Sequence, residues 1–132
     1  MAKKNLTETN KFILWVNDHL SMDEDRHRAL MEKGVTVVCA ASTEKAVDLF
    51  GRARYDAVVT DLRRLEYGQK NDSAGIELTQ QIRNSNNHIP IFIYTINIDS
   101  SVVELAKRAG ATMITTNPVE LDAALKQHQL IA

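Results

Sequence analysis

The sequence predicts an α/β domain built on a five-stranded parallel sheet with helices on both faces. Five short apolar runs rich in β-branched residues alternate with five segments in which apolar residues recur at helical spacing. Strands that alternate with helices are joined by crossover connections, so the strands become parallel and both faces are covered. The 132 residues, 44% of them hydrophobic, suit one core. We expect a single domain over residues 12–132 after a flexible N-terminal arm at residues 1–11.

Composition and charge exclude several classes of function. The formal net charge is −1 and no basic run is present, which argues against direct binding of nucleic acid or a membrane surface. The apolar runs are much shorter than a membrane span, and the N-terminus lacks the apolar core of a signal peptide. A single cysteine, Cys39, cannot form an internal disulfide and suits a reducing compartment, so we expect a cytoplasmic protein.

The first strand is predicted at residues 12–16, a continuous apolar run that ends in Asn17 and Asp18. Ser21 and Glu24 have the spacing of a capping box, which predicts a helix that begins at Ser21 and stops before Gly34. The second strand follows at residues 35–40. Trp15 is expected in the core. Cys39 is also expected there, rather than as a nucleophile.

The third strand, predicted at residues 55–61, is apolar in its middle and ends abruptly in a carboxylate, Asp61. It follows a helix that Ser42 or Thr43 caps. A charge is costly inside a sheet, so Asp61 should lie at the strand's carboxyl end. In an open α/β sheet, ligands bind at that edge. Asp61 could also be an ordinary solvated strand-end residue, but the polar groups that share its edge favour a site.

The second half of the chain continues the alternation. It is predicted, in order, as a polar connection at 63–73, a helix at 75–83, a strand at 90–95, a helix with a capping box from Ser101 to Ala109, a strand at 111–116 and a last helix after Asn117. Asn117, Pro118 and Glu120 form a good helix start, so capping is the expected role of Asn117. Thr95 ends the fourth strand and should reach the same edge as Asp18 and Asp61.

These residues make the chain resemble the receiver domain of bacterial response regulators, over residues 12–130. The resemblance implies a doubly wound, flavodoxin-like sheet with the strand order 2-1-3-4-5. It also implies that Asp61 is the phosphoacceptor and that Thr95 supplies the hydroxyl that moves onto the phosphoryl group. Asp18 and Asp61 would coordinate Mg²⁺ directly. Asn17 would not coordinate the ion itself but would contact the groups that do. Such oxygen ligands suit Mg²⁺.

The sequence departs from the family pattern at the same edge. Asn17 stands where the family usually has a second acidic residue. The loss of that negative charge should weaken the binding of the metal ion. Asn117 stands where the family has a lysine, so the cation expected on the phosphoryl group is absent, and Ile114 replaces an aromatic residue. The span after Asp61 is longer than the family norm and contains Arg63, Arg64 and Lys70. Any of these three could supply the missing cation.

Two hypotheses about function remain, and neither is an enzyme. The first is a stand-alone receiver that is phosphorylated on Asp61 in a Mg²⁺-dependent way and so switches a protein-binding surface. The alternative is a pseudo-receiver that acts as a phosphorylation-independent docking or dimerisation module. The resemblance implies a sensor histidine kinase or phosphotransfer protein as donor, a downstream protein bound through Ser101–Gln129, and a possible homodimer.

Two further features carry competing interpretations. Ile96 and Ile98 follow the fourth strand, where a loop is expected. They either form an exposed partner surface or fold back under the next helix. His19 beside Asp18 could support the site, although an exposed loop histidine is the simpler interpretation.

Overall fold

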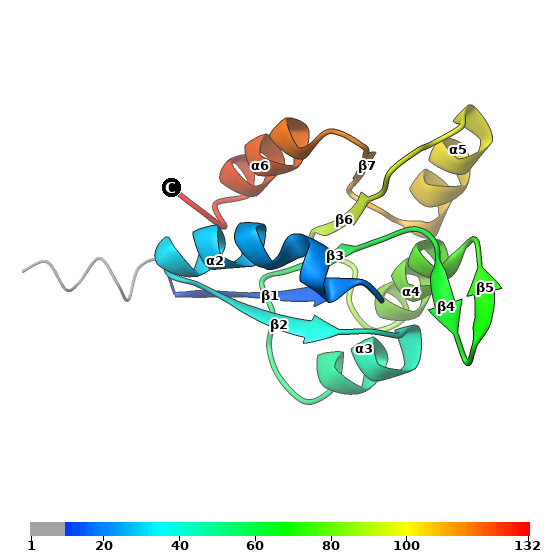
Figure 1. Cartoon of the computed structure of the whole chain (residues 1–132), viewed down its shortest axis with the longest axis horizontal. Coiled ribbons are helices and arrows are strands. Elements are labelled where there is room, and N and C mark those ends of the chain that lie inside the picture. Colours follow the sequence, from blue (N-terminus) through cyan, green and yellow to red (C-terminus); the bar gives the residue numbers. More distant parts are fainter. Residues whose placement is uncertain (1–9) are drawn as a thin grey trace, which may run out of the picture.

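A computed structural model describes residues 10–132 of the chain, shown in Figure 1. An N-terminal arm was predicted at residues 1–11, and residues 1–9 of it lie outside the described residues. Lys11 is the first residue of the first strand. The elements are, in order, β1 (Lys11–Val16), the 3-10 helix η1 (Leu20–Asp23), α2 (Glu24–Glu32), β2 (Val35–Ala40), α3 (Thr43–Phe50), β3 (Ala57–Thr60), β4 (Arg64–Glu66), β5 (Gln69–Asn71), α4 (Ala74–Arg83), β6 (Ile91–Tyr94), α5 (Ser100–Ala109), β7 (Met113–Thr115) and α6 (Pro118–Gln127).

The main sheet has five parallel strands in the order β2-β1-β3-β6-β7. These are the five predicted strands, so the predicted order 2-1-3-4-5 is confirmed. The strands are in register at their carboxyl ends, where Val16 lies beside both Ala40 and Thr60. The residues that follow these strands therefore meet along one edge of the sheet.

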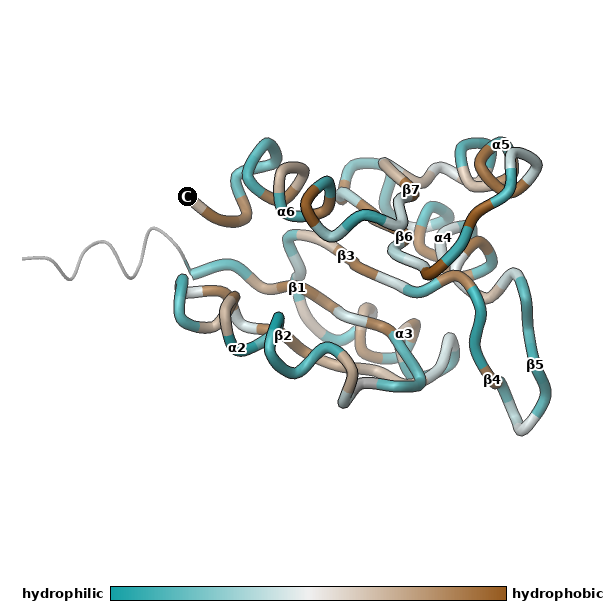
Figure 2. Tube along the Cα trace, turned by 45° about the horizontal axis from the view of Figure 1, so that its top comes forward, coloured by the Kyte–Doolittle hydropathy of each residue, from teal (hydrophilic) through white to brown (hydrophobic). Residues whose placement is uncertain are grey.

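Alternate residues of β1 face opposite layers of helices. Ile13 and Trp15 pack in a cluster that contains Leu30 of α2 and Leu121 and Leu125 of α6. Leu14 and Val16 pack instead with residues from α3 and α4, namely Ala46, Leu78 and Ile82. Figure 2 shows the brown, hydrophobic stretches of β1 and β3 in the middle of the molecule. This period of two is what a strand buried on both faces requires.

Trp15 is buried in this core, as predicted, at 1% exposure. Its indole edge meets the ring of His27 at 4.6 Å between centroids and 70° between planes. The indole N–H donates to Asp23 Oδ2 at 3.1 Å. Two polar side chains therefore contact the core at this point, Asp23 at the end of η1 and His27 in α2.

The predicted capping box at Ser21 is wrong. Residues Leu20–Asp23 form the 3-10 helix η1, and α2 begins only at Glu24. Asp23 stands at the N-cap position of α2 but makes no side-chain cap bond. The reason lies in its other contacts, because its carboxylate already accepts from Trp15 and from Asn17.

The capping residue predicted for α5 is also wrong, whereas two other caps are confirmed. Asp99, not Ser101, caps α5 by accepting from the backbone N–H of Val102 at 3.1 Å. A carboxylate there competes with the hydroxyl of Ser101, which donates to Asp99. Ser42 caps α3 and Asn117 caps α6, where it accepts from Val119 N at 2.8 Å.

The polar connection predicted at residues 63–73 contains a β-hairpin that the sequence did not indicate. Strands β4 and β5 pair antiparallel, with Leu65 opposite Lys70. The turn between them is formed by Tyr67 and Gly68, which both have positive φ, at 56° and 77°. Paired positive φ values are typical of the tight turns that close two-residue hairpins. Figure 1 shows the hairpin projecting beyond the main sheet near α4.

Cys39 is not a core residue, contrary to the prediction. It is exposed because β2 is an edge strand of the sheet. Its Sγ lies 3.8 Å from His27 Nδ1. As for membranes, none of the helices formed by residues 10–132 is both long enough and apolar enough to span a bilayer.

Candidate functional site

Asp61 lies directly after β3, at the carboxyl edge of the sheet, as predicted. Its backbone N–H donates to Val16 O at 3.0 Å, and its carbonyl accepts from Thr60 Oγ1 at 2.9 Å. Helix α4 packs against the same backbone, since a Cβ atom added at Gly75 would lie only 2.1 Å from Asp61 O. Three elements thus fix the backbone from which the Asp61 carboxylate projects.

Asp18 lies beside Asp61, so the predicted pair of carboxylates does form. The charge and the backbone N–H of Asp18 both act on the pKa of the Asp61 carboxyl group, the charge raising it and the N–H lowering it. The side chain of Asp18 points at the hairpin, where its Oδ2 accepts from the backbone N–H of Leu65 at 2.9 Å. Both carboxylates are largely shielded from solvent, with 15% of the Asp18 side chain and 11% of the Asp61 side chain exposed.

A buried guanidinium occupies the space next to Asp61. Arg64 has no exposed side-chain surface, and its Nη1 donates both to the Asp61 carboxylate and to Thr60 Oγ1. Its Nη2 donates to Thr43 Oγ1 at 2.6 Å, and its Nε donates to Glu66 Oε2. Of the three cations left open by the sequence, Arg64 is therefore the one that contacts Asp61.

The other two cations lie elsewhere. Arg63 donates to the backbone carbonyl of Asn97 at 3.2 Å, in the loop before α5. Lys70 is exposed on β5 and approaches Asp72 at 3.8 Å. These contacts are with other residues, and Arg64 is the one of the three that pairs with Asp61.

Burial governs the ionisation of Asp61. Desolvation raises the pKa of its carboxyl group to about 6, and the charge of Asp18 adds to this. The charge and hydrogen bond of Arg64 lower the pKa, as does the N–H of Asp18, but they do not fully offset the burial. Arg64 therefore partly stabilises a carboxylate that would otherwise resist ionisation.

Asn17 uses both of its polar atoms inside its own loop. Its Nδ2 donates to Asp23 Oδ2 at 3.0 Å, and its Oδ1 accepts from the backbone N–H of His19 at 2.7 Å. These bonds make Asn17 a brace of the loop after β1. His19 itself is exposed, and its Nε2 lies 3.9 Å from Asp18 Oδ1.

Thr95 follows β6 at the same edge and is half-buried. Its backbone N–H donates to Thr115 O at 3.1 Å. No hydrogen bond joins its hydroxyl to Asp61 within the described part of the chain. The next residue, Ile96, is 83% exposed, whereas Ile98 is half-buried.

The arrangement disfavours a magnesium ion, because one oxygen of each carboxylate is already engaged. Mg²⁺ requires oxygen ligands with free lone pairs in nearly octahedral geometry. Here the Asp61 carboxylate is paired with Arg64, and Oδ2 of Asp18 accepts from Leu65 N–H. Over residues 10–132, no three His, Cys, Asp or Glu side chains are grouped so that they could hold a metal ion.

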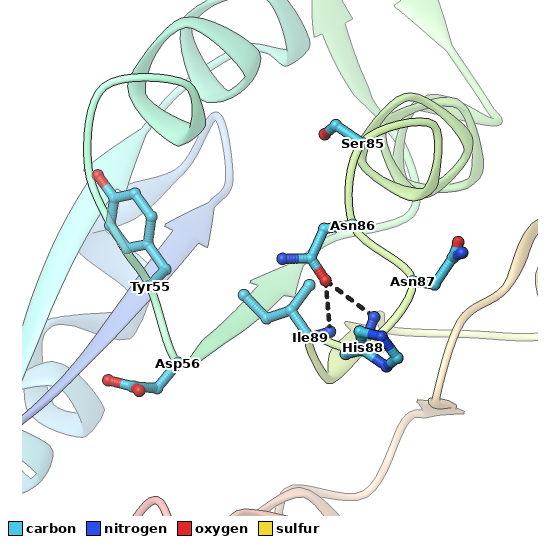
Figure 3. A pocket seen from close by; sticks show the side chains of 7 residues that line it. All are labelled: Tyr55, Asp56, Ser85, Asn86, Asn87, His88 and Ile89. Atoms are coloured by element: carbon cyan, nitrogen blue, oxygen red, sulfur yellow. Dashed lines mark hydrogen bonds between the residues drawn. The ribbon is translucent and has the colours of Figure 1, made fainter.

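A surface pocket lies at the opposite end of the sheet, at the amino ends of β3 and β6. Figure 3 shows Tyr55 and Asp56 on one wall and the turn after α4 on the other. Asn86 braces this turn by accepting from the backbone N–H groups of His88 and Ile89 at 2.8 and 2.9 Å. None of the predicted site residues lines this pocket.

Comparison with known proteins now identifies the family. The model of the response regulator receiver domain matches residues 13–128. The chain belongs to this family. The receiver family comprises signalling domains that are generally phosphorylated on an aspartate, typically bind Mg²⁺ there and are not typically enzymes. They interact with histidine kinases or phosphotransfer proteins and with downstream effectors.

Named relatives and solved structures agree with this membership. Response regulator MprA of Mycolicibacterium vanbaalenii is 30% identical over 115 residues, which are 86% of this chain and 46% of the relative. A response regulator receiver protein of Anaeromyxobacter is 26% identical over 112 residues, 85% of this chain and 44% of that protein. The chain thus spans about half the length of these curated relatives.

Two solved receiver-type structures show the same fold. A LuxR-family two-component response regulator from Aurantimonas has a TM-score of 0.74 at 29% identity, covering 89% of this chain and 84% of that one. The chemotaxis protein CheY4 of Vibrio cholerae has a TM-score of 0.74 at 23% identity, covering 89% and 97%.

Sequence reasoning missed most of the residues that surround Asp61 in this receiver domain. Thr43 was considered only as a helix cap, and Thr60 only as part of a strand. Glu66 was assigned to a polar connection. The one available signal was the cluster of basic residues after Asp61, and it did not distinguish Arg64 from its neighbours.

Proposed function

We propose that this receiver domain is a protein-docking module that works without phosphorylation of Asp61. One observation carries the proposal: the Asp61 carboxylate is closed by an ion pair with the buried Arg64. A carboxylate that attacks phosphorus needs a free oxygen and nearby cations that can bind the transferred group. In this domain one oxygen of the carboxylate, Oδ1, is paired with the neighbouring cation.

Two other groups that could contact a phosphoryl oxygen, the Arg64 guanidinium and the Asn117 side chain, are also engaged. A guanidinium has five N–H donors, and Arg64 makes four hydrogen bonds to Asp61, Thr60, Thr43 and Glu66. Asn117, at the position of the family lysine, caps α6. Binding of a phosphoryl group would therefore require several buried hydrogen bonds to break.

A surface for a partner protein is available on the side of the domain that carries α5 and α6. The predicted contact region, Ser101–Gln129, includes Leu105 at 49% exposure and Val119 at 72%. Ile96, in the loop that leads into α5, is 83% exposed. Large apolar side chains exposed to this degree are typical of protein interaction surfaces. The same surface could serve a downstream protein or a second copy of the domain.

The second candidate is a receiver that is phosphorylated on Asp61 by a histidine kinase or phosphotransfer protein in the presence of Mg²⁺. The neighbouring carboxylates of Asp18 and Asp61, and Thr95 at the end of β6, favour it. Phosphorylation would then pull Thr95 inward and reposition Ile96. This function requires Arg64 to leave Asp61.

An amide NMR titration separates the two candidates. Mg²⁺ and then beryllofluoride, which mimics a phosphoryl group, are added to the wild type and to Asp61→Asn. The docking function predicts that neither protein shows ligand-dependent shifts at Thr95 and Ile96. Shifts of these two amides in the wild type alone would overturn it and establish the phosphorylated switch.

A further inference from the structure

The hairpin of β4 and β5 is fastened to the site at several points. Glu66 accepts from the backbone N–H of Thr43 at 3.0 and 3.2 Å and from its hydroxyl at 3.1 Å. The hydroxyl of Tyr67 donates to Glu44 Oε1 at 2.6 Å. These contacts tie the hairpin to the first turn of α3. The hairpin is therefore held in one position over the carboxyl edge of the sheet.

The return of the hairpin to α4 is fastened as well. Asn71 Oδ1 accepts from the backbone N–H of Ser73 at 2.9 Å, and its Nδ2 donates to Glu77 at 3.0 Å. Because both ends of the hairpin are anchored, the position of Arg64 does not depend on its own side-chain bonds alone.

Two consecutive residues of β4 satisfy the two carboxylates of the site. Arg64 brings a positive charge to Asp61, and Leu65 brings its backbone N–H to Oδ2 of Asp18. A divalent cation bound between the pair would have to share these carboxylates with Arg64 and with the N–H of Leu65. The hairpin thus places a positive charge and a hydrogen-bond donor beside the two carboxylates. Both act where a bound cation would supply positive charge.

The burial of Arg64 makes this arrangement costly to undo. A buried charge is tolerated only when it is paired and hydrogen-bonded. The guanidinium has acceptors from β3, α3 and β4, and none of its side-chain surface is exposed. A cation entering between Asp18 and Asp61 would leave a positive charge buried beside it.

We infer that Arg64 is the resident cation of this receiver domain and stands in place of the divalent metal, so that the hairpin keeps the Asp18–Asp61 pair closed to metal ions. This inference deepens the proposed docking function, on which it rests, by naming what holds the site closed. It also assigns a role to the extra length between β3 and α4. The role requires the guanidinium at residue 64, not positive charge in general.

Paramagnetic broadening by Mn²⁺ tests the inference. Mn²⁺ is titrated into the wild type, Arg64→Gln and the matched control Arg63→Gln, while the amide signals of Asp18 and Leu62 are followed. The control loses the same charge one residue away, where the side chain donates to Asn97 O and Arg64 keeps its contact with Asp61. We expect no broadening of these amides in the wild type, and in Arg64→Gln broadening at Mn²⁺ concentrations at least about tenfold below the highest one used, because a paired buried carboxylate is released. Arg63→Gln should match the wild type.

Three results would overturn the inference. They are binding of Mn²⁺ by the wild type at these two amides, a folded Arg64→Gln that binds no better than the wild type, and equal gains in both variants. If Arg64→Gln is unfolded, millimolar Mg²⁺ should restore its folded spectrum, because a ligand of the native state stabilises it. Failure of Mg²⁺ to restore it would count equally against the inference.

The two proposals fail in different experiments. Beryllofluoride shifts in the wild type without any bound metal would remove the docking function but leave Arg64 as the resident cation. If Arg64→Gln is folded but does not bind Mn²⁺, the role of Arg64 as resident cation is lost. The docking function survives that result as long as the wild type does not respond to beryllofluoride.

Discussion

Arg64 is the side chain on which the electrostatics of the site depend. Its Nη1 contacts the Asp61 carboxylate, and its other donors are distributed over Thr43, Thr60 and Glu66. A buried pair of this kind adds little net stability relative to apolar groups, but removal of one member is costly. Its value here is the geometry that it imposes on Asp61.

The pKa of Asp61 should respond to this geometry. Arg64 lowers the pKa of Asp61 by its charge and hydrogen bond, and the resulting value is about 6. Arg64→Gln should therefore raise the pKa of Asp61 above that value. Carboxyl ¹³C chemical shifts measured against pH test this, with Arg63→Gln as the control. An unchanged or lower pKa in Arg64→Gln would contradict the proposed contact.

His27 predicts a pH dependence of stability. Burial lowers the pKa of His27 below its ordinary value, and the negative charge of Asp23 offsets this only in part. Its Nε2 is buried and has no hydrogen-bond partner among residues 10–132. The unfolded chain therefore binds a proton near pH 6.5 that the folded state resists, so stability is complete above that pH and is lost as the pH falls.

Urea denaturation followed by circular dichroism at about pH 7.5, 6.5 and 5.5 measures this effect. Across the series the wild type should lose more stability, or gain less, than His27→Leu, because Asp61, with its pKa raised to about 6, takes up a proton in both folded proteins and cancels from the comparison. Exposed His88 supplies the control, because His88→Leu should retain the wild-type slope. Equal slopes in all three proteins would show that His27 does not carry the effect.

At the scale of elements, the close packing of α4 on β3 fixes Asp61. The first turn of α4 contains Gly75, whose N–H donates to Leu62 O at 2.9 Å. No side chain can fit between them, since a Cβ atom would lie 2.1 Å from Asp61 O and 3.2 Å from the Cα atom of Leu62. The glycine is required by this approach of two backbones.

Gly75→Ala should accordingly destabilise the domain by about 2 kcal/mol or more, because overpacking forces the backbones apart. At an unconstrained helical site the same change normally stabilises. Gly51→Ala is the matched control, since its new Cβ would meet only atoms at 3.6 and 3.7 Å. Chemical denaturation provides both values, and a neutral Gly75→Ala would show that α4 moves freely relative to Asp61.

The elements also show what sequence can and cannot predict. The five main strands were predictable, because apolar β-branched runs such as Val58 and Val59 have few alternatives. The hairpin was not, since Arg64 and Glu66 have polar side chains that satisfy one another only after the chain has folded. A cap such as Asp99 was missed because a nearby Ser101 offers the same local chemistry.

Some residues of the candidate site could likewise be predicted from sequence, and others could not. Asp18, Asp61 and Thr95 follow strands whose order is recognisable, so their common edge could be predicted. The partners of Asp61 could not, because Thr43 and Arg64 are 21 residues apart and meet through a hairpin that has no local signature. Edge exposure of Cys39 likewise depends on strand order, not on its own neighbours.

The whole molecule is held together by helices on both faces of a single sheet. The layer containing α2 and α6 includes Leu125, which has no exposed surface. Leu125→Ala should cost about 2–5 kcal/mol in unfolding free energy, since it removes contacts and leaves a cavity. Half-exposed Leu105 is the control, and Leu105→Ala should stay within about 0.5 kcal/mol of wild type. A small effect at Leu125 would indicate that α6 contributes little to the core.

The contact between Trp15 and His27 has an optical consequence for the whole domain. Trp15 is the only tryptophan of the chain, and its indole is buried against the His27 ring. Its N–H shares the Asp23 carboxylate with Asn17, the neighbour of Asp18. The fluorescence of one native chromophore therefore reports unfolding as a red shift and protonation of His27 as quenching. It senses the loop that carries Asp18 without any attached dye.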